Sequence, residues 1–245
     1  MKYEALAPVY DRLMNHVEYD EWVVLIDNVL QKFCQNKNPS ILELGGGTGI
    51  LAGKLLSSGY SYIGSDLSFS MCKQALLKGI PFVCSDCRHI PIDKIFDLII
   101  FLYDGINYLQ TLNDYSILFS EVYNHLSVNG LFLFDITTET NSVKYFMDYF
   151  DFEDYEDISF VRHSFYDMKN SLQFNEFTIF QRDSQNKNFF RKANEKHIQK
   201  VYSVKNIESI IPLDKFKIIG IWDNFSFKKY SQKSERIHFL LKKIA

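Results

Sequence analysis

The most constraining feature of the sequence is a glycine-rich run that directly follows a short apolar stretch. Residues Ser40–Leu44 read as a buried strand, and four of the next five residues, 45–49, are glycine. Glycines at the end of a strand let the backbone turn sharply and let a ligand approach with no Cβ in the way. A helical pattern follows, and the first turn of a helix offers unpaired N–H groups. The run therefore predicts a crevice for a nucleotide-like ligand.

Strand patterns alternate with helical patterns up to residue 136, and this alternation predicts an α/β fold with a doubly wound, mostly parallel sheet. The continuous apolar run Phe96–Leu102 is typical of a strand that is covered on both faces. From about Thr137 to Tyr202 the helical period weakens, β-formers dominate, and polar turns separate the runs, which predicts a small antiparallel insertion. We expect seven strands in the main sheet, at Ser40–Leu44, Tyr60–Gly64, Phe82–Cys84, Phe96–Leu102, Leu131–Ile136, Phe216–Trp222 and Arg236–Lys242, and three in the insertion, at Ile158–Phe165, Leu172–Phe180 and Phe189–Tyr202.

This pattern divides the chain into a core, residues 1–136 and 203–245, and an inserted antiparallel β subdomain, residues 137–202, that would act as a lid or substrate-binding unit. Five phenylalanines of the insertion are compatible with a lid over an apolar acceptor, with core packing, or with the contact face of a homodimer. They are Phe160, Phe165, Phe174, Phe177 and Phe180.

Composition and charge exclude several classes of function. The chain is 47% hydrophobic and 23% charged, with a formal net charge of -3, which argues against a groove that binds nucleic acid through bulk positive charge. It has no apolar run near the roughly 20 residues of a membrane helix, and its N-terminus lacks the apolar core of a signal peptide, so we expect no membrane partner. Cys84 and Cys87 have the spacing of a metal or redox pair, but no second close Cys/His pair completes a zinc site. We therefore expect no metal and a cytoplasmic location.

Three acidic residues follow the first three predicted strands: Glu43, Asp66 and Asp86. Ligands of open α/β sheets bind beyond the carboxyl ends of the strands, so these residues should converge on one crevice, although each alone is also common as a helix N-cap. The glycines also match a dinucleotide fingerprint, Gly47-x-Gly49-x-x-Ala52. However, Glu43 would repel a pyrophosphate there. S-adenosylmethionine, which combines an adenosine ribose, a cationic centre and an amino-acid tail, suits the crevice better.

The segment E-L-G-G-G-T-G, residues 43–49, resembles motif I of the class I S-adenosylmethionine-dependent methyltransferases, which have a Rossmann-like fold. Two further segments, G-S-D-L-S around Asp66 and S-D-C at 85–87, resemble the parts of that superfamily that bind the ribose hydroxyls and the adenine amino group. The N-terminal A-P-V-Y-D-R-L-M, the Y-D-G-I-N-Y-L after the fourth strand, and the β insertion ending in E-K-H and a tyrosine are similar to a small-molecule subgroup. The resemblance extends over essentially the whole chain.

The resemblance implies roles for individual residues. It implies S-adenosylmethionine as cofactor, and the implied cofactor-binding residues are Tyr10, Glu43, Gly45, Gly47, Asp66, Leu67, Asp86, Cys87 and Leu102. The candidate catalytic residues are Asp104, Tyr108 and His197, with Asn107 and Tyr202 as further candidates near the acceptor. For Tyr108 and Tyr202 the alternative is aromatic packing, and for His197 it is an exposed strand position.

We therefore expect a methyltransferase that acts on a small-molecule acceptor, with amines slightly favoured over hydroxyls. Gly46 stands where this family often has cysteine or alanine, and the loop after the fourth strand lacks the Asn-Pro-Pro-Tyr type of sequence that marks amino methylation of DNA bases, which further disfavours a nucleic-acid partner. Two alternatives remain at this point. One is an NAD(P)-dependent oxidoreductase on the same fold, and the other is a non-catalytic methyltransferase-like module that binds a partner. The sequence does not identify the acceptor.

Overall fold

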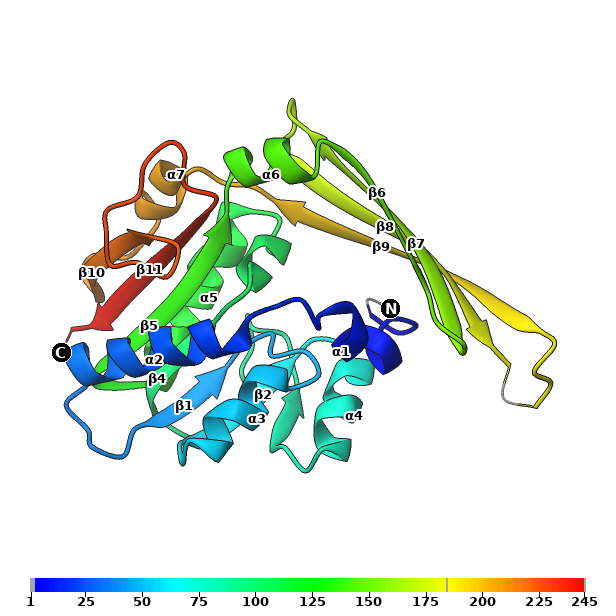
Figure 1. Ribbon diagram of the computed structural model, residues 1–245. Helices are drawn as coiled ribbons and strands as arrows, with labels where there is room; N and C mark the ends of the chain where they lie inside the picture. Colours follow the sequence, from blue (N-terminus) through cyan, green and yellow to red (C-terminus); the bar gives the residue numbers. More distant parts are fainter. Residues whose placement is uncertain (1–2, 184, 245) are drawn as a thin grey trace.

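The main sheet lies between two layers of helices (Figure 1). The computed structural model describes residues 3–183 and 185–244. The strand order is β10-β11-β5-β4-β1-β2-β3, in which β1 to β5 pair in parallel, while β11 runs antiparallel to β5 and β10 antiparallel to β11. The strands are β1 (Ser40–Glu43), β2 (Ser61–Asp66), β3 (Phe82–Cys84), β4 (Phe96–Phe101), β5 (Leu126–Thr137), β10 (Phe216–Asp223) and β11 (Arg236–Lys243). The α/β fold with a mostly parallel seven-stranded sheet is confirmed.

Alternating residues of the central strands pack into two separate hydrophobic clusters, one on each face of the sheet. Ile41 and Leu98 face the layer of α2 (Tyr19–Phe33), α3 (Ile50–Ser57) and α4 (Phe69–Leu77). Leu42 and Ile99 face the layer of α5 (Leu112–His125) and α7 (Val204–Glu208). Burial on both faces explains why the strands read as continuous apolar runs.

The ends of three helices are fixed by local contacts. The Ser68 hydroxyl caps α4 by accepting from the Met71 N–H, and Gly59, with φ +87°, follows the end of α3. Helix α5 ends at His125, where the Lys243 ammonium binds the Tyr123 and Leu126 carbonyls.

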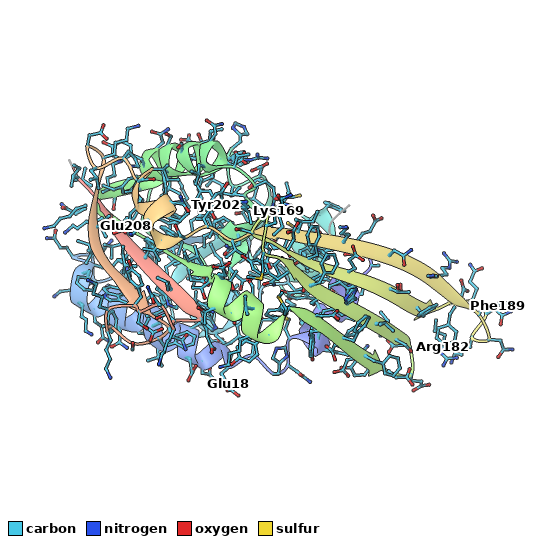
Figure 2. All side chains as sticks on the ribbon, turned by 90° about the horizontal axis from the view of Figure 1, so that it is seen from above. Glu18, Lys169, Arg182, Phe189, Tyr202 and Glu208 are labelled. Atoms are coloured by element: carbon cyan, nitrogen blue, oxygen red, sulfur yellow. The ribbon has the colours of Figure 1, made fainter. Side chains whose placement is uncertain are left out.

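A separate four-stranded antiparallel sheet projects from the core (Figure 1). It follows α6 (Glu139–Tyr145) and consists of β6 (Asp148–Asp154), β7 (Ile158–Asp167), β8 (Leu172–Arg182) and β9 (Phe190–Lys200), in that order across the sheet. Figure 2 shows Lys169 and Tyr202 near the core, and Arg182 and Phe189 at the far end. The sequence prediction missed β6 because acidic residues, which are unfavourable in strands, alternate with its aromatic residues.

The two faces of this sheet differ. Cross-strand pairs place Phe160, Phe177 and Ile179 on an inner face, where they are buried against Leu6 and Val9 of the N-terminal segment. The N-terminal segment, residues 3–14, which contains η1 (Ala7–Val9) and α1 (Tyr10–Leu13), is called the strap below. It lies between the core and the inserted sheet. Of the five phenylalanines of the insertion, two are therefore core residues.

None of the described helices combines the length and apolar character needed to cross a membrane.

Candidate active site

The glycine loop after β1 requires glycine at Gly45. Gly45, Gly47 and Gly49 all have positive φ values, of +64°, +57° and +79°. A Cβ on Gly45 would lie 2.7 Å from the Phe101 ring, so a side chain there would be strained in conformation and would also collide. The loop is held against the end of β2, since the Gly46 N–H donates to the Ser65 carbonyl at 2.9 Å.

Asp66 lies at the end of β2, beside this loop. Its carboxylate accepts the Gly47 N–H at 3.0 Å and the Ser68 N–H at 2.8 Å, one on each oxygen. Burial raises the pKa of Asp66, and these two hydrogen bonds oppose the shift. Each oxygen still has a free lone-pair direction, so the carboxylate can accept two hydroxyl donors, as from a ribose.

Asp86 and Cys87 follow β3 at the same edge of the sheet. The Arg88 guanidinium binds the Asp86 carboxylate at 2.6 Å and also reaches Asp114 of α5 at 2.5 Å. The hydrogen bonds from Arg88 lower the pKa of Asp86. Burial raises the pKa of the Cys87 thiol to about 12, so it is a neutral wall residue at physiological pH.

These residues surround one cavity of about 410 Å³, the first cavity. Its size is in the range of small-ligand and cofactor sites. Along the sheet edge the glycine loop follows β1, Asp66 ends the neighbouring β2, and Asp86 follows β3 beyond it. Eight of the nine expected cofactor-binding residues line the cavity: Tyr10, Gly45, Gly47, Asp66, Leu67, Asp86, Cys87 and Leu102.

The ninth, Glu43, lies beneath the glycine loop and lines a small adjoining cavity of about 50 Å³. It is buried and accepts a hydrogen bond from the Tyr62 hydroxyl. Burial raises its pKa to about 7. A Cβ on Gly46 would lie 2.9 Å from the Glu43 carboxylate, so Glu43 packs against the loop and does not line the first cavity.

A second cavity, of about 610 Å³, lies between the core and the inner face of the inserted sheet. Four tyrosines line both cavities and form the tyrosine wall between them: Tyr3, Tyr10, Tyr103 and Tyr108. The Tyr3 and Tyr108 hydroxyls are 2.5 Å apart, and the Tyr3 ring contacts Tyr10 edge-on with centroids 5.7 Å apart. Two of these tyrosines come from the strap and two from the segment after β4, so strap docking completes the wall.

Asp104 follows Tyr103 in the loop after β4, and both have positive φ values, of +50° and +59°. The Asp104 carboxylate binds Arg236 of β11 at 3.0 Å and Gln199 of β9 at 2.5 Å, while its N–H donates to Asp135 of β5 at 2.9 Å. Arg236 also binds Asp135. Burial raises the pKa of both carboxyl groups, and Arg236 opposes this shift. The candidate Asp104 thus lies in the second cavity within a buried ionic network.

The candidates His197 and Tyr108 both line the second cavity. His197 is only 1% exposed, so the alternative of an exposed strand position is wrong. Its ring lies over Tyr3, with centroids 4.2 Å apart, and its Nε2 is 3.2 Å from Glu195. Nδ1 has no hydrogen-bond partner among the described residues.

Asn107 and Tyr202 have other roles. Asn107 is fully buried and joins three segments, since it donates to the Lys200 carbonyl at 2.9 Å and accepts the Thr137 N–H at 3.1 Å. Tyr202 lines neither the first nor the second cavity and packs edge-on against Tyr115. For Tyr202 the packing alternative agrees with the structure.

Sequence reasoning missed most residues of the second cavity. Tyr3 precedes the quoted N-terminal motif, and no local pattern marks an arginine at the start of a last strand or glutamines within an insertion. Only Tyr103, inside the quoted Y-D-G segment, had a usable signal. The missed residues include Tyr3, Tyr103, Arg162, Gln173, Gln199 and Arg236.

Comparisons with known proteins agree with this geometry. A family model described as a methyltransferase domain matches residues 41–130. YqeM, a provisionally named methyltransferase of Bacillus subtilis strain 168, is 29% identical over 99% of this chain and 98% of its own length. A second provisionally named methyltransferase, from Geobacillus sp. strain WCH70, is also 29% identical, over 99% of this chain and all of its own.

Among solved structures, an S-adenosylmethionine-dependent methyltransferase from Clostridium acetobutylicum ATCC 824 has a TM-score of 0.81 and 26% identity, covering 99% of both chains. The domain match includes the glycine loop, Asp66 and Asp86, and the structural match extends over the inserted sheet. This chain therefore contains a methyltransferase domain and has the fold of the S-adenosylmethionine-dependent methyltransferases.

Proposed function

We propose that this methyltransferase transfers the methyl group of S-adenosylmethionine to the nitrogen of a small polar amine bound in the second cavity. The observation that supports the proposal is the charge of that cavity. Three carboxylates line it or bind a side chain that lines it, and one guanidinium group accompanies them. The carboxylates are Asp104, Asp135 and Glu195, and the guanidinium group is Arg236. Arg162 with Asp151, and Lys144 with Glu235, form balanced and more exposed pairs.

An excess of buried carboxylates favours a cationic ligand, because a buried charge is stable only when it is paired. A neutral alcohol gains nothing from that excess, whereas an ammonium group gains a counterion. The solved structures with the same fold include one named as a sugar N-methyltransferase, at 15% identity and a TM-score of 0.76. That likeness concerns the fold, and the amine acceptor of this chain is argued from its own side chains.

In the proposed mechanism, the bound cofactor supplies an electrophilic methyl group on a sulfonium centre. Asp66 would hold its ribose hydroxyls, and the glycine loop would admit its methionine part close to the backbone. The tyrosine wall excludes water at the junction of the two cavities and leaves the acceptor one direction of approach, which favours in-line displacement. The residues of the second cavity hold the amine and remove its proton.

We test the proposal with labelled S-adenosylmethionine and a panel of matched acceptors that differ only in an amine or a hydroxyl group. Transfer is followed as label in the acceptor and as S-adenosylhomocysteine formed. We expect turnover with polar amines and little or none with their hydroxyl counterparts. Preferential methylation of the hydroxyl member of a pair would overturn the proposal. Calorimetric titration with S-adenosylhomocysteine, with NADH as the control, verifies the cofactor independently of any acceptor.

The proposal also places the reaction in the cytoplasm. All four cysteines are free thiols in the structure, which suits a reducing compartment. Fractionation of cells that express the protein, with the protein located by antibody, tests this placement. Recovery outside the cytoplasmic fraction would contradict it.

A further inference from the structure

Glu195 of β9 joins the strap to His197. One of its carboxylate oxygens, Oε1, accepts the N–H groups of Ala5 and Leu6, the latter at 3.2 Å. The other oxygen, Oε2, lies 3.2 Å from His197 Nε2. Glu195 is 9% exposed. The carboxylate is therefore shared between the backbone of a segment near the N-terminus and a histidine almost two hundred residues later.

These contacts determine which nitrogen of His197 holds the proton. Burial acts to raise the pKa of Glu195, but the hydrogen bonds from His197, Ala5 and Leu6 outweigh it and the pKa is lowered. An ionised carboxylate can only accept, so Nε2 is the protonated nitrogen of the neutral ring. Nδ1 then bears a lone pair.

Nδ1 of His197 is left with a free lone pair in a ring that lines the second cavity. It is buried and has no hydrogen-bond partner among the described residues, although an unpaired buried polar atom is energetically unfavourable. The ring lines the second cavity and contacts Tyr3 and Tyr108 of the tyrosine wall, with centroids 4.2 Å and 6.2 Å away. Within the described part of the chain, His238 also leaves one nitrogen unpaired, but it lines neither cavity, whereas His197 keeps its acceptor nitrogen in a ring that lines the second cavity.

We propose that His197 is the catalytic base of the methyl transfer, through Nδ1, and that Glu195 is a positioning residue that orients it only when the strap is docked. The inference rests on the proposed function. Nδ1 takes a proton from the bound ammonium group, which frees the lone pair of the acceptor nitrogen. The lone pair forms the bond to the methyl carbon, the carbon–sulfur bond breaks, and its electron pair stays on sulfur. Glu195 stabilises the resulting imidazolium, which later loses a proton to water.

This arrangement connects ligand enclosure to base formation. The two strap amides and His197 bind opposite oxygens of one carboxylate, so a displaced strap leaves Glu195 without two of its donors and removes Tyr3 from the His197 ring. The base is therefore correctly oriented only in a closed site. Removal of the acceptor proton is therefore confined to the state in which the strap is docked and water is excluded.

The first experiment determines the tautomer of His197 directly and needs no methyl acceptor. In protein labelled with ¹⁵N-histidine and saturated with S-adenosylhomocysteine, we expect His197 in the Nε2–H form, with an unprotonated Nδ1. In Glu195→Gln the amide can still accept from the strap, but it can also donate to Nε2, which favours the opposite tautomer. An identical His197 signal in wild type and Glu195→Gln would overturn the positioning role.

The second experiment measures turnover with the amine that reacts fastest in the panel. Glu195→Gln should lower kcat about 100-fold or more, within the range for loss of a general base, while KM and affinity for S-adenosylhomocysteine change little. His197→Ala should lose as much activity and regain part of it with added imidazole. A loss that appears only in KM, or no rescue by imidazole, would assign His197 to acceptor binding and contradict the proposal.

A matched control is available on the other face of the same sheet. His163 of β7 also pairs with a carboxylate, Asp148 of β6, at 2.8 Å, but it stacks on the exposed ring of Phe150 and lines neither cavity. His163→Ala and Asp148→Asn should leave kcat and the His197 signal unchanged. If the wild type binds S-adenosylhomocysteine but methylates no amine, the proposed function fails, while the tautomer experiment still decides the positioning role.

Discussion

The two cavities on either side of the tyrosine wall are built in opposite ways. The first is formed mainly by loops at the ends of consecutive parallel strands, so apart from Tyr3 and Tyr10 of the strap its residues lie close together in the sequence, from Gly45 to Asp114. The second draws on the strap, the loop after β4, α6, the inserted sheet and β11. The first cavity therefore depends on local backbone geometry, and the second on long-range contacts. The following variants test that difference, from the largest expected effect to the smallest.

Arg236→Met probes the second cavity. It leaves Asp135, whose side chain is fully buried, without its counterion, and loss of one partner of a buried pair costs about 3–5 kcal/mol of unfolding free energy. Chemical denaturation of the variant measures this loss. Adding Asp135→Asn should recover part of it. Arg162→Met is the control, because its partner Asp151 is 23% exposed and the loss should be clearly smaller. Equal losses of stability in the two variants would contradict the expectation that a more deeply buried ion pair costs more to break.

The pH dependence of the unfolding free energy tests how Glu43 supports the glycine loop. Its pKa is about 7 in the folded protein, against an ordinary value of 4.5, so the folded state binds the proton more tightly than the unfolded state. Stability should therefore fall as pH rises from below 4.5 to above 7, by about 3 kcal/mol for a shift of this size. Glu43→Gln should lack this component. Denaturation at pH 5 and pH 8 measures it, and identical slopes for the two proteins would contradict it.

Asp66→Ala should weaken binding of S-adenosylhomocysteine by about 1.5–3 kcal/mol, because the ribose hydroxyls lose an ionised acceptor. Isothermal titration calorimetry measures the change. The effect should be confined to the first cavity, so the KM of the amine at saturating cofactor should change little. Asp86→Ala is the comparison. Since Arg88 already occupies its carboxylate, we expect a smaller loss of affinity. Unchanged affinity in folded Asp66→Ala would remove Asp66 from the site.

Tyr3→Phe should have the smallest effect, because it removes one hydroxyl from the wall and keeps the ring over His197. Loss of the hydrogen bond to Tyr108 should cost about 1 kcal/mol. It should weaken binding in both cavities together, unlike the other variants. Parallel measurement of cofactor affinity and amine KM checks this. A change in only one of them would show that the wall does not act as a shared element.

The sequence was informative where the constraint is local. The glycines of residues 45–49 and the acid at Asp66 mark a strand–loop–helix unit whose geometry permits few alternatives, and the strand pattern around it predicts the sheet. It was least informative for the second cavity. Arg236 is one of several cations near the C-terminus, and only the pairing of β11 with β5 brings it to Asp135. Glu43 belongs to the glycine-loop motif, but the spacing of the motif does not predict where its side chain lies. Its contacts in the folded protein place it beneath the loop.

The shared wall has a kinetic consequence. Tyr3 and Tyr10 belong to one short segment, which is tied to the inserted sheet by Arg12 on Asp157 and to the core by Asp11 on Lys78. If that segment moved away as a unit, both cavities would open together, and the spent cofactor and the methylated product would leave in the same step. Where this opening is the slow step, the turnover rate across a series of amines would not depend on their basicity. A burst of product in the first turnover would then precede the slower steady-state rate.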